Sequence, residues 1–537
     1  MKVLVLGGVA AGTKVAAKLK REDQSAEVTI ITKGEDISYA GCGLPYYLSH
    51  TIESRDSLIV NTPESFSALT GVKVLNNTEA LRVDIEGKKV MASDGQTYGY
   101  DKLVIATGAR AIVPDIPGKD LKNVYTVRTV DDVLRLREFL ETSGVKKAMV
   151  VGAGYIGLEV AENLNKMGIR PFVLERAPYI LQPGFDEEMA EYIKDKLVEA
   201  GIPVVNNVTV TAIEGNEKVE KLITDKKAYK TDIVIFCAGI RANTEFLNNT
   251  GLKMDRGLIE TDEYGMTNLE DIYAVGDCAL VRNRITGKMV YSPMGSTANI
   301  FGRIVAENIS GHKKSYHGVL GTAVCKLAGF NVARTGLSEK QARDLGYDVI
   351  SSLIVANDKA HYYPDADSFV IKLVADKSDE RLLGLQVIGK GAVDKVNDIG
   401  VTAISLKAKV SDLCDMDLSY APPFSTAIHP LAVAINVLMN KMNGSYESMT
   451  PYEYMHGEAE GYTIIDTTQG ASISGTRYVE LTKVDGPVEG LEKDDKLLLV
   501  CNKGRKAYLL QNKLKSYGYT NTKVLEGGIT FNNVEGE

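Results

Sequence analysis

The sequence predicts an α/β protein with two Rossmann-like nucleotide-binding domains, an α+β domain and a small C-terminal α/β domain. Three observations predict this fold class: a strand, glycine turn and helix at the N-terminus, a second copy of that unit at 147–175, and a change of pattern after residue 325. A supersecondary unit that returns later in the chain sets the architecture. At 537 residues, the chain is long enough for three or four domains of about 150 residues each.

The first unit is a strand at 2–6, a glycine turn, a helix to residue 21 and a second strand at 27–32. A glycine turn between strand and helix lets backbone N–H groups approach a pyrophosphate at the helix N-terminus. This turn departs from the regular G-x-G-x-x-G pattern, because a valine stands where the middle glycine is expected. The residues expected to bind a dinucleotide here are Gly7, Gly8, Val9, Ala10, Ala11 and Gly12.

The second unit matches G-x-G-x-x-G fully at 152–157, between a strand and a helix. Glu175 ends the next strand, where a carboxylate accepts hydrogen bonds from a ribose 2′-OH, so the pattern favours NADH. Arg176 beside it would accommodate a 2′-phosphate, which keeps NADPH open, and a merely tight strand–helix turn is the structural alternative. The expected contacts are Gly152, Gly154, Tyr155, Ile156, Gly157 and Glu175.

Three further segments are predicted as strands that join these two units: 100–110, 231–241 and 271–279. The last is a strand that ends in Gly276-Asp277, and an Asp at that position can bond a ribityl hydroxyl of a flavin. Two dinucleotide units with this Asp predict FAD in the first and NADH in the second, with hydride passing to the flavin. Further predicted FAD contacts are Thr32, Lys33, Ala106, Thr107, Gly108, Gly276 and Asp277.

These patterns divide the chain into five parts. The predicted parts are an FAD-binding domain at 1–112 and 250–324, an NAD-binding domain at 113–249, an α+β domain at 325–445, a linker at 446–461 and a last domain at 462–537.

Cys42 is the candidate redox nucleophile, because the glycines on both sides of it in the segment SYAGCGLPYY at 38–47 leave the sulfur open. We expect helix residues after it to lower the pKa of the thiol. No second cysteine is near, so the thiol would cycle through a mixed disulfide, a persulfide or a sulfenic acid. An inert buried cysteine is the alternative.

The first helix carries a cationic stripe, Lys14, Lys18 and Arg21, spaced so that the three share one face. A solvated face is the simpler reading. The alternative is a binding surface for a phosphate-rich thiol such as coenzyme A, with Ser38 of the cysteine segment as a further substrate contact.

At this point residues 1–445 resemble the coenzyme A disulfide reductase branch of the pyridine nucleotide-disulfide reductases, which includes NADH oxidases and peroxidases. The matching motifs are SYAGCGLPYY, ATGA at 106–109, GAGYIGLE at 152–159, YAVGD at 273–277, HYYP at 361–364 and LSYAPPFS at 418–425. The resemblance implies a homodimer built through 325–445, in which Tyr420 and Tyr362 or Tyr363 reach the partner's thiol site. It also implies that Tyr155 covers the flavin. Packed interface aromatics are the alternative for each tyrosine.

The tail resembles a rhodanese domain. The segment 501–505, CNKGR, matches the C-x-x-G-x of that family's active loop, and LEGG at 525–528 fits its closing motif. Loop N–H groups would stabilise a thiolate or persulfide on Cys501. Arg505 lies one place before the usual arginine and Lys506 stands at that place, so a degenerate docking domain is the alternative.

The leading hypothesis is an enzyme: an NADH-dependent FAD oxidoreductase that reduces CoA disulfide, CoA persulfide or polysulfide through Cys42, with Tyr362, Tyr420 and Cys501 as further catalytic residues. The alternatives are an NADH oxidase that uses a cysteine sulfenic acid and a non-catalytic flavoprotein scaffold. A net charge of −8 argues against a nucleic-acid partner. The absence of a long apolar run argues against a membrane span. Six scattered cysteines predict neither disulfides nor a metal site and favour the cytoplasm.

Overall fold

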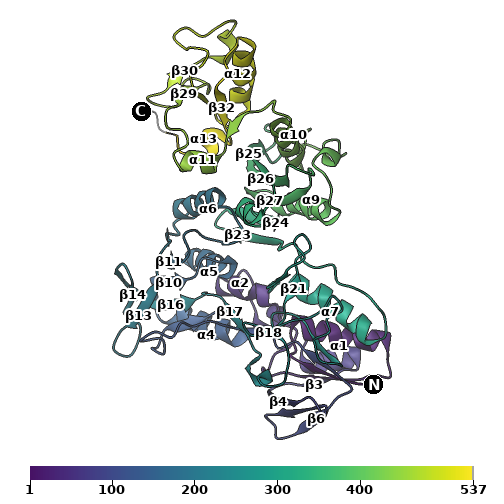
Figure 1. The fold of residues 1–537 in the computed structure, drawn as a ribbon. Coiled ribbons are helices and arrows are strands. Elements are labelled where there is room, and N and C mark those ends of the chain that lie inside the picture. Colours follow the sequence, from purple (N-terminus) through teal and green to yellow (C-terminus); the bar gives the residue numbers. More distant parts are fainter. Residues whose placement is uncertain (535–537) are drawn as a thin grey trace. The chain divides into compact units, whose positions relative to one another are not determined.

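The computed structural model describes residues 1–534 and confirms the predicted fold class. The chain forms two compact units (Figure 1). The first contains Met1–Pro178 and Gly201–Val319. The second contains Tyr179–Ala200 and the residues from Leu320 onward. Residues 179–200, predicted as part of the NAD-binding domain, therefore pack with the second unit.

The first sheet is parallel because its strands run directly into helices that return across its faces. Val5 at its centre is fully buried and pairs with Ile30 on one side and Val104 on the other. Such apolar strands, covered on both faces, are typical of parallel sheets. In order, the strands are β20 (Ile272–Ala274), β7 (Lys102–Ile105), β1 (Lys2–Leu6), β2 (Glu27–Ile31) and β3 (Lys73–Leu75).

Helices α1 (Ala10–Glu22) and α7 (Gly295–Ile309) lie side by side and contribute to the core beneath this sheet (Figure 1). Two short helices, α2 (Leu44–Leu48) and α3 (Pro63–Thr70), follow β2 in the sequence. The small antiparallel elements of this domain are β4 (Ala80–Asp84), β5 (Lys89–Ala92), β6 (Thr97–Gly99), β8 (Ala109–Ala111) with β17 (Ile240–Ala242), β18 (Met254–Asp255), β19 (Leu258–Ile259), β21 (Val281–Arg282) and β22 (Met289–Val290).

The second parallel sheet repeats the first, and its α4 (Val130–Thr142) and α5 (Tyr155–Lys166) follow strands in the same way. In order, its strands are β12 (Val204–Val205), β11 (Arg170–Leu174), β10 (Lys147–Val151), β16 (Ile233–Phe236) and β9 (Val124–Thr126). A separate antiparallel sheet is formed by β13 (Val210–Glu214), β14 (Lys221–Thr224) and β15 (Ala228–Lys230).

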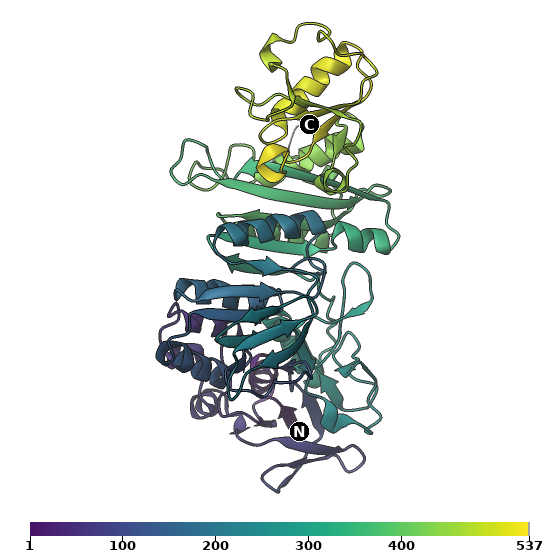
Figure 2. The same cartoon turned by 90° about the vertical axis from the view of Figure 1, so that its left-hand side faces the viewer.

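The second unit begins with an antiparallel sheet, along which α6 (Glu187–Glu199) lies (Figure 2). In order, its strands are β23 (Ala323–Leu327), β24 (Phe330–Gly336), β27 (Leu382–Gly389), β26 (Ser368–Asp376) and β25 (Val349–Asn357). The helices that accompany it are α8 (Glu339–Asp344), α9 (Val393–Ser405) and α10 (Pro430–Met442).

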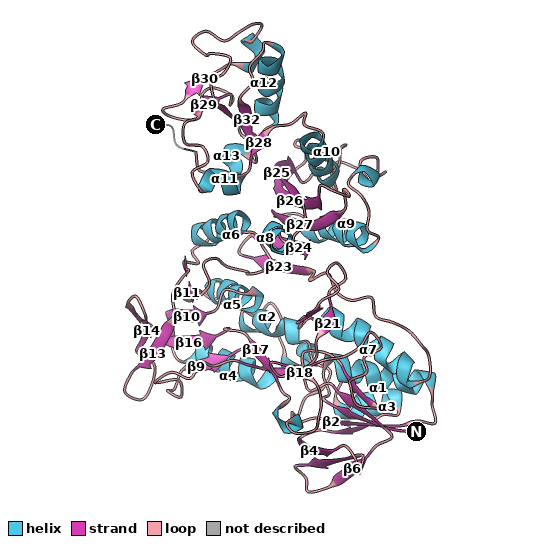
Figure 3. Ribbon diagram, viewed as in Figure 1, coloured by secondary structure: helices cyan, strands magenta, loops and turns pink. Residues whose placement is uncertain are grey.

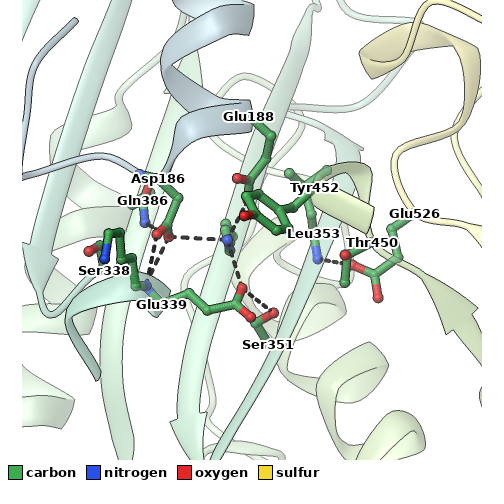
Figure 4. Close-up of polar contacts among 12 residues, drawn as sticks. Asp186, Glu188, Ser338, Glu339, Ser351, Leu353, Gln386, Thr450, Tyr452 and Glu526 are labelled. Atoms are coloured by element: carbon green, nitrogen blue, oxygen red, sulfur yellow. Dashed lines mark hydrogen bonds and ion pairs between the residues drawn. The ribbon is translucent and has the colours of Figure 1, made fainter. Parts of the chain in front are cut away.

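Lys372 on β26 holds α6 to this sheet through the carboxylates of Asp186, Glu188 and Glu339, which are labelled in Figure 4. Its side chain is 4% exposed, and its Nζ lies 3.1 Å from Asp186 Oδ2, 2.9 Å from Glu339 Oε2 and in contact with Glu188. Burial alone would raise the pKa of Glu339, but Lys372 and its other hydrogen bonds outweigh burial and lower the pKa to about 2. Burial raises the pKa of Glu188 despite the ammonium. The cluster therefore depends on a single buried cation.

We expect Lys372→Met to make local unfolding of β26 and α6 more frequent. Removing one partner of a buried ion pair costs about 3 kcal/mol or more, because it leaves uncompensated buried charge. Hydrogen exchange of the β26 and α6 amides should then speed up by about a hundredfold, since each factor of ten corresponds to about 1.4 kcal/mol. Lys340→Met, which removes an exposed cation paired with Asp344, is the control and should leave exchange unchanged. Equal exchange in both variants would contradict the role of Lys372.

The tail forms a five-stranded parallel sheet with helices between its strands (Figure 3). In order, its strands are β28 (Ser448–Met449), β32 (Thr522–Leu525), β31 (Leu497–Val500), β29 (Thr463–Asp466) and β30 (Arg477–Tyr478). Its helices are α11 (Pro451–Met455), α12 (Arg505–Ser516) and α13 (Gly528–Phe531). Residues 448–455, predicted as linker, thus belong to the tail, because β28 pairs with β32.

Glu526 fastens the tail to the antiparallel sheet (Figure 4). Its side chain is buried, and its carboxylate accepts hydrogen bonds from the backbone N–H of Leu353 at 2.7 Å, from Lys441 at 2.7 Å and from Ser448 at 2.6 Å. Leu353 lies on β25, the edge strand of that sheet. The buried carboxylate thus satisfies an edge-strand donor that would otherwise lack a partner.

Candidate active site

The turn after β1 is shaped by close backbone approaches that only glycine allows. Gly7 has φ +110°, and a Cβ on it would lie 2.1 Å from the carbonyl oxygen of Ala106. A Cβ on Gly12 would lie 1.8 Å from the carbonyl oxygen of Gly7. Helix α1 can therefore begin directly after β1, with its first N–H groups facing the end of that strand. The turn keeps this geometry even though Val9 replaces the middle glycine.

The turn after β10 repeats that geometry. Gly152 has φ +109°, and its Cβ would lie 2.4 Å from the carbonyl oxygen of Cys237. A Cβ on Gly157 would lie 2.0 Å from the carbonyl oxygen of Gly152, whereas Gly154 has no atom within 4 Å of its Cβ position. Open space at Gly154, beside the N-terminus of α5, fits a pyrophosphate. Tyr155 and Ile156 begin α5, and Tyr155 is half-buried.

The residues at the ends of β2 and β11 differ in their surroundings. The Glu175 carboxylate accepts hydrogen bonds from the backbone N–H of Ala153 at 2.7 Å and of Ala177 at 2.8 Å, so it lies against the glycine turn. Thr32 is buried, while Lys33 is exposed and pairs with Glu79 at 3.0 Å. Glu175 is therefore fixed at the predicted ribose position, whereas Lys33 extends into solvent.

The return strands bring the remaining predicted FAD contacts to the first turn. A Cβ on Gly276 would lie 2.9 Å from the Cβ of Ala11, which shows how closely the end of β20 approaches α1. Thr107 donates to the carbonyl oxygen of Asn243 at 2.8 Å. Gly108 has φ +64°. The loop after β7 is thus held next to the Gly7 turn by contacts from distant parts of the sequence.

Arg128 is a site residue that sequence reasoning missed. Its guanidinium lies 2.7 Å from Asp277 Oδ2, and its Nε donates to the carbonyl oxygen of Ala109 at 2.9 Å. The predicted ribityl contact, Asp277, is thereby paired with an arginine from the loop before α4. No sequence motif identifies Arg128, because its role depends on its contact with Asp277, which lies 149 positions away in the sequence.

Cys42 lies in a short turn, Gly41–Gly43, immediately before α2, and is exposed as predicted. Burial of its sulfur raises the pKa of the thiol, the carboxylates of Glu159 and Asp277 raise it further, and Arg128 partly opposes them. The expectation that the chain lowers the pKa of this thiol is therefore wrong, because burial of the sulfur and, after it, the two carboxylates favour the neutral thiol. The same contacts place Cys42 among residues of both nucleotide-binding units.

The Cys42 segment is held from both sides. Tyr46 donates to Glu159 on α5 at 3.0 Å. Arg137 on α4 stacks over the ring of Tyr47 at 4.3 Å and donates to its carbonyl oxygen at 3.2 Å. Ser38, at the start of the segment, adopts φ +49° and donates its N–H to the carbonyl oxygen of Gly8. Cys42 thus has a rigid frame that spans the first turn and α5.

The cationic stripe on α1 is partly neutralised. Lys18 Nζ lies 3.3 Å from Glu307 Oε1 and contacts Glu22, and its side chain is 14% exposed. Lys14 is half-buried and Arg21 is exposed. Lys18 is therefore less available to a phosphate than the helical spacing alone suggested.

Tyr362 and Tyr420 meet in the second unit, although 58 positions separate them. Their phenols share a hydrogen bond, which raises the pKa of Tyr420. Tyr362 is 67% exposed and Tyr420 50% exposed, and Phe424, four positions after Tyr420, is 75% exposed. Exposed aromatic side chains in such number mark a surface suited to a partner.

Cys501 follows β31 and is 2% exposed. Its Sγ accepts a hydrogen bond from the backbone N–H of Ala507 at 3.4 Å, at the start of α12. A Cβ on Gly528 would lie 2.0 Å from the Cys501 carbonyl oxygen, so the closing glycines pack directly on the loop. Arg505 and Lys506 are exposed. The sulfur has an N–H donor at the helix start, as predicted, but it is buried.

Among residues 1–534, no group of three or more His, Cys, Asp or Glu side chains is placed to hold a metal ion. In the same part of the chain, no helix has both the length and the apolar character needed to cross a bilayer.

Comparisons with known proteins agree with this architecture. The family model described as pyridine nucleotide-disulphide oxidoreductase matches residues 1–297, and that family's dimerisation domain matches residues 322–432. An NADH oxidase of Methanocaldococcus jannaschii is 34% identical over 447 residues, 82% of this chain and 100% of the relative. An NAD(P)H coenzyme A polysulfide/persulfide reductase of Pyrococcus horikoshii is 35% identical over 439 residues, 81% of this chain and 98% of the relative.

Two solved structures match nearly the whole chain, including the tail. The NAD-dependent persulfide reductase from A. fulgidus has a TM-score of 0.94 and 33% identity, covering 99% of this chain and 100% of that one. Bacillus anthracis CoADR-RHD has a TM-score of 0.93 and 32% identity, covering 99% of this chain and 97% of that one. With the family model matching more than half of the sequence, the chain belongs to the pyridine nucleotide-disulphide oxidoreductase family.

Proposed function

We propose that this protein is an NADH-dependent flavoprotein reductase of CoA persulfide, CoA disulfide or polysulfide, with Cys42 as its redox thiol. The observation that carries the proposal is the position of Cys42: it is exposed, and it interacts electrostatically with Asp277 of the first nucleotide-binding domain and Glu159 of the second nucleotide-binding domain. Relatives named as persulfide and CoA disulfide reductases support the substrate class.

The chain's own residues fit both cofactors. The Gly7 turn and the N-terminus of α1 would hold the FAD pyrophosphate, and the open Gly154 would face that of NADH. Glu175, fixed by two backbone N–H groups, would accept the ribose hydroxyl. When bound, NADH and FAD would supply two electrons at the sulfur of Cys42.

The chemistry at Cys42 is thiol–disulfide exchange. The Cys42 thiolate attacks one sulfur of the substrate S–S bond; a new S–S bond forms to Cys42 and the other half leaves as thiolate or hydrosulfide. Two electrons then cleave the new bond, which releases the bound half and restores the thiolate. The raised pKa of Cys42 makes the attacking thiolate a strong nucleophile once it forms.

CoA recognition is assigned to Lys14, Lys18, Arg21 and Ser38. The two lysines and the arginine would bind phosphates, and Ser38 lies at the start of the Cys42 segment. Because Lys18 already contacts two carboxylates, Lys14 and Arg21 would carry more of the attraction.

We expect the triple change Lys14→Ala, Lys18→Ala and Arg21→Ala to raise the KM for CoA persulfide by about tenfold, because each charge contact contributes about 1 kcal/mol or less. A phosphate-free alkyl persulfide should keep its KM in steady-state NADH oxidation. Lys89→Ala, at an exposed position on β5, is the control. An unchanged KM for CoA persulfide in the triple variant would show that the stripe is only a solvated helix face.

The homodimer is also part of the proposal. The matched dimerisation domain and the exposed pair Tyr362–Tyr420 support an arrangement in which these phenols reach the partner's thiol site. The six cysteines are all free, which fits a reducing cytoplasm. The tail would handle sulfane sulfur at Cys501 and deliver it to, or accept it from, CoA.

Stopped-flow oxidation of NADH with CoA persulfide, CoA disulfide and oxygen tests the proposal. Rapid turnover with CoA persulfide is expected, and slower turnover with the other two. Fast turnover with oxygen alone would instead identify an NADH oxidase, the name that several relatives carry. No turnover with any of the three would indicate a flavoprotein scaffold.

A further inference from the structure

Lys503 joins the Cys501 loop of the tail, residues 501–505, to the antiparallel sheet. Lys503 lies two positions after Cys501, and its Nζ donates to Asn357 Oδ1 at 2.7 Å and to Ser368 Oγ at 2.7 Å. Asn357 is the last residue of β25 and Ser368 the first of β26, and the two pair directly across the hairpin. Lys503 therefore closes the base of the loop 358–367.

That loop carries Tyr362. Its base is further ordered by two hydrogen bonds: the N–H of Asp358 donates to the carbonyl oxygen of Asp367 at 2.9 Å, and the N–H of Asp367 donates to the Asp358 carboxylate at 2.7 Å. Both carboxylates also interact electrostatically with the Lys503 ammonium. At its tip Tyr362 shares a hydrogen bond with Tyr420. A shift of the Lys503 ammonium would thus move two hydrogen-bond acceptors and two carboxylates at the point where the tyrosine loop begins and ends.

The other end of the link is equally fixed. The carbonyl oxygens of Cys501 and Asn502 accept hydrogen bonds from Ile529 and Thr530 at 3.1 and 3.0 Å. Gly504 turns the chain into α12 with φ +90°. The backbone around Lys503 cannot move without breaking these contacts. A change in the conformation of the Cys501 loop would therefore move the Lys503 ammonium and, with it, Asn357 and Ser368.

We propose that Lys503 is a positioning residue that couples the Cys501 loop to the Tyr362 loop, so that the tail sets the placement of Tyr362 at the thiol-reducing site. The inference rests on the proposed function for the role of Tyr362, but the coupling itself is a property of the second unit. It gives the tail a part in reduction at Cys42 that is separate from any sulfur transfer by Cys501.

The test compares Lys503→Met with Lys483→Met, a change of the same charge at an exposed tail position. In Lys503→Met we expect kcat for free CoA persulfide to fall about fivefold, with the KM for NADH unchanged. Because Lys503 acts through Tyr362, the same change in a Tyr362→Phe background should add less than about a twofold effect. Full additivity, or wild-type kcat in Lys503→Met, would overturn the proposal.

A second readout does not depend on activity. In protein with 3-fluorotyrosine at position 362, the ¹⁹F resonance should shift in Lys503→Met and stay in place in Lys483→Met. If the wild-type protein fails to reduce CoA persulfide, the proposed function fails while this signal still decides the coupling. An unmoved resonance in Lys503→Met would overturn it.

Discussion

Cys42→Ser is expected to abolish turnover with CoA persulfide and CoA disulfide, by at least about a thousandfold, as for loss of a catalytic nucleophile. A serine hydroxyl cannot form the S–S bond on which the exchange depends. The glycine turns and Glu175 are untouched, so the variant should still bind FAD and accept a hydride from NADH. Steady-state turnover and single-turnover reduction by NADH, measured on the same preparation, check both halves of this expectation.

Cys414→Ser is the matched control for this prediction. Cys414 is half-exposed and lies in the second unit, where its Sγ bonds only to the carbonyl oxygen of Val410 among the contacts described for it. The same chemical change there should leave turnover normal. Near-normal persulfide turnover in Cys42→Ser would remove Cys42 from the mechanism and leave the flavin to react with the acceptor directly.

The features that the sequence predicted well are local ones. Gly7, Gly12, Gly152 and Gly157 are required by backbone approaches within one strand–turn–helix unit, so their spacing alone identifies the two turns. The exposure of residue Cys42 also follows from its neighbours, because the glycines on both sides have no side chains to cover it. Local patterns such as these are read reliably when a long periodic context surrounds them.

The features that the sequence did not predict depend on contacts between distant residues. Strand β28 has two residues and exists only because it pairs with β32, so residues 448–449 resembled a linker. Residues 179–200 follow the NAD-binding pattern but are drawn into the second unit by Lys372, a lysine with no local signal of burial. Arg128 likewise gains its role only through Asp277. The pKa of Cys42 depends first on burial of its sulfur and then on the carboxylate of Glu159, a residue 117 positions away in the sequence.

Cys501→Ser is expected to abolish sulfur transfer from polysulfide or thiosulfate by the tail, while reduction of free CoA persulfide at Cys42 stays largely intact. In the transfer, the Cys501 thiolate attacks the terminal sulfur of a polysulfide, a persulfide forms on Cys501 and a chain one sulfur shorter leaves. The N–H of Ala507, 3.4 Å from Sγ, can stabilise the anionic sulfur in both forms. Because Cys501 is 2% exposed, the loop must open for the donor to reach it, so loading should be slower than reaction at Cys42.

Mass spectrometry after brief polysulfide treatment separates a sulfur carrier from a docking domain. A carrier gains about 32 Da, one sulfur atom, on the peptide that contains Cys501, and the gain is absent in Cys501→Ser. Cys278, fully buried in the first unit, serves as the internal control, since a cysteine that no donor can reach should remain unlabelled. Labelling of Cys42 without Cys501 would show that the shifted position of Arg505 has left the loop unable to close around an anion. Sulfur would then reach the flavin site by diffusion, and the tail would act on Cys42 only through the contacts that Lys503 makes.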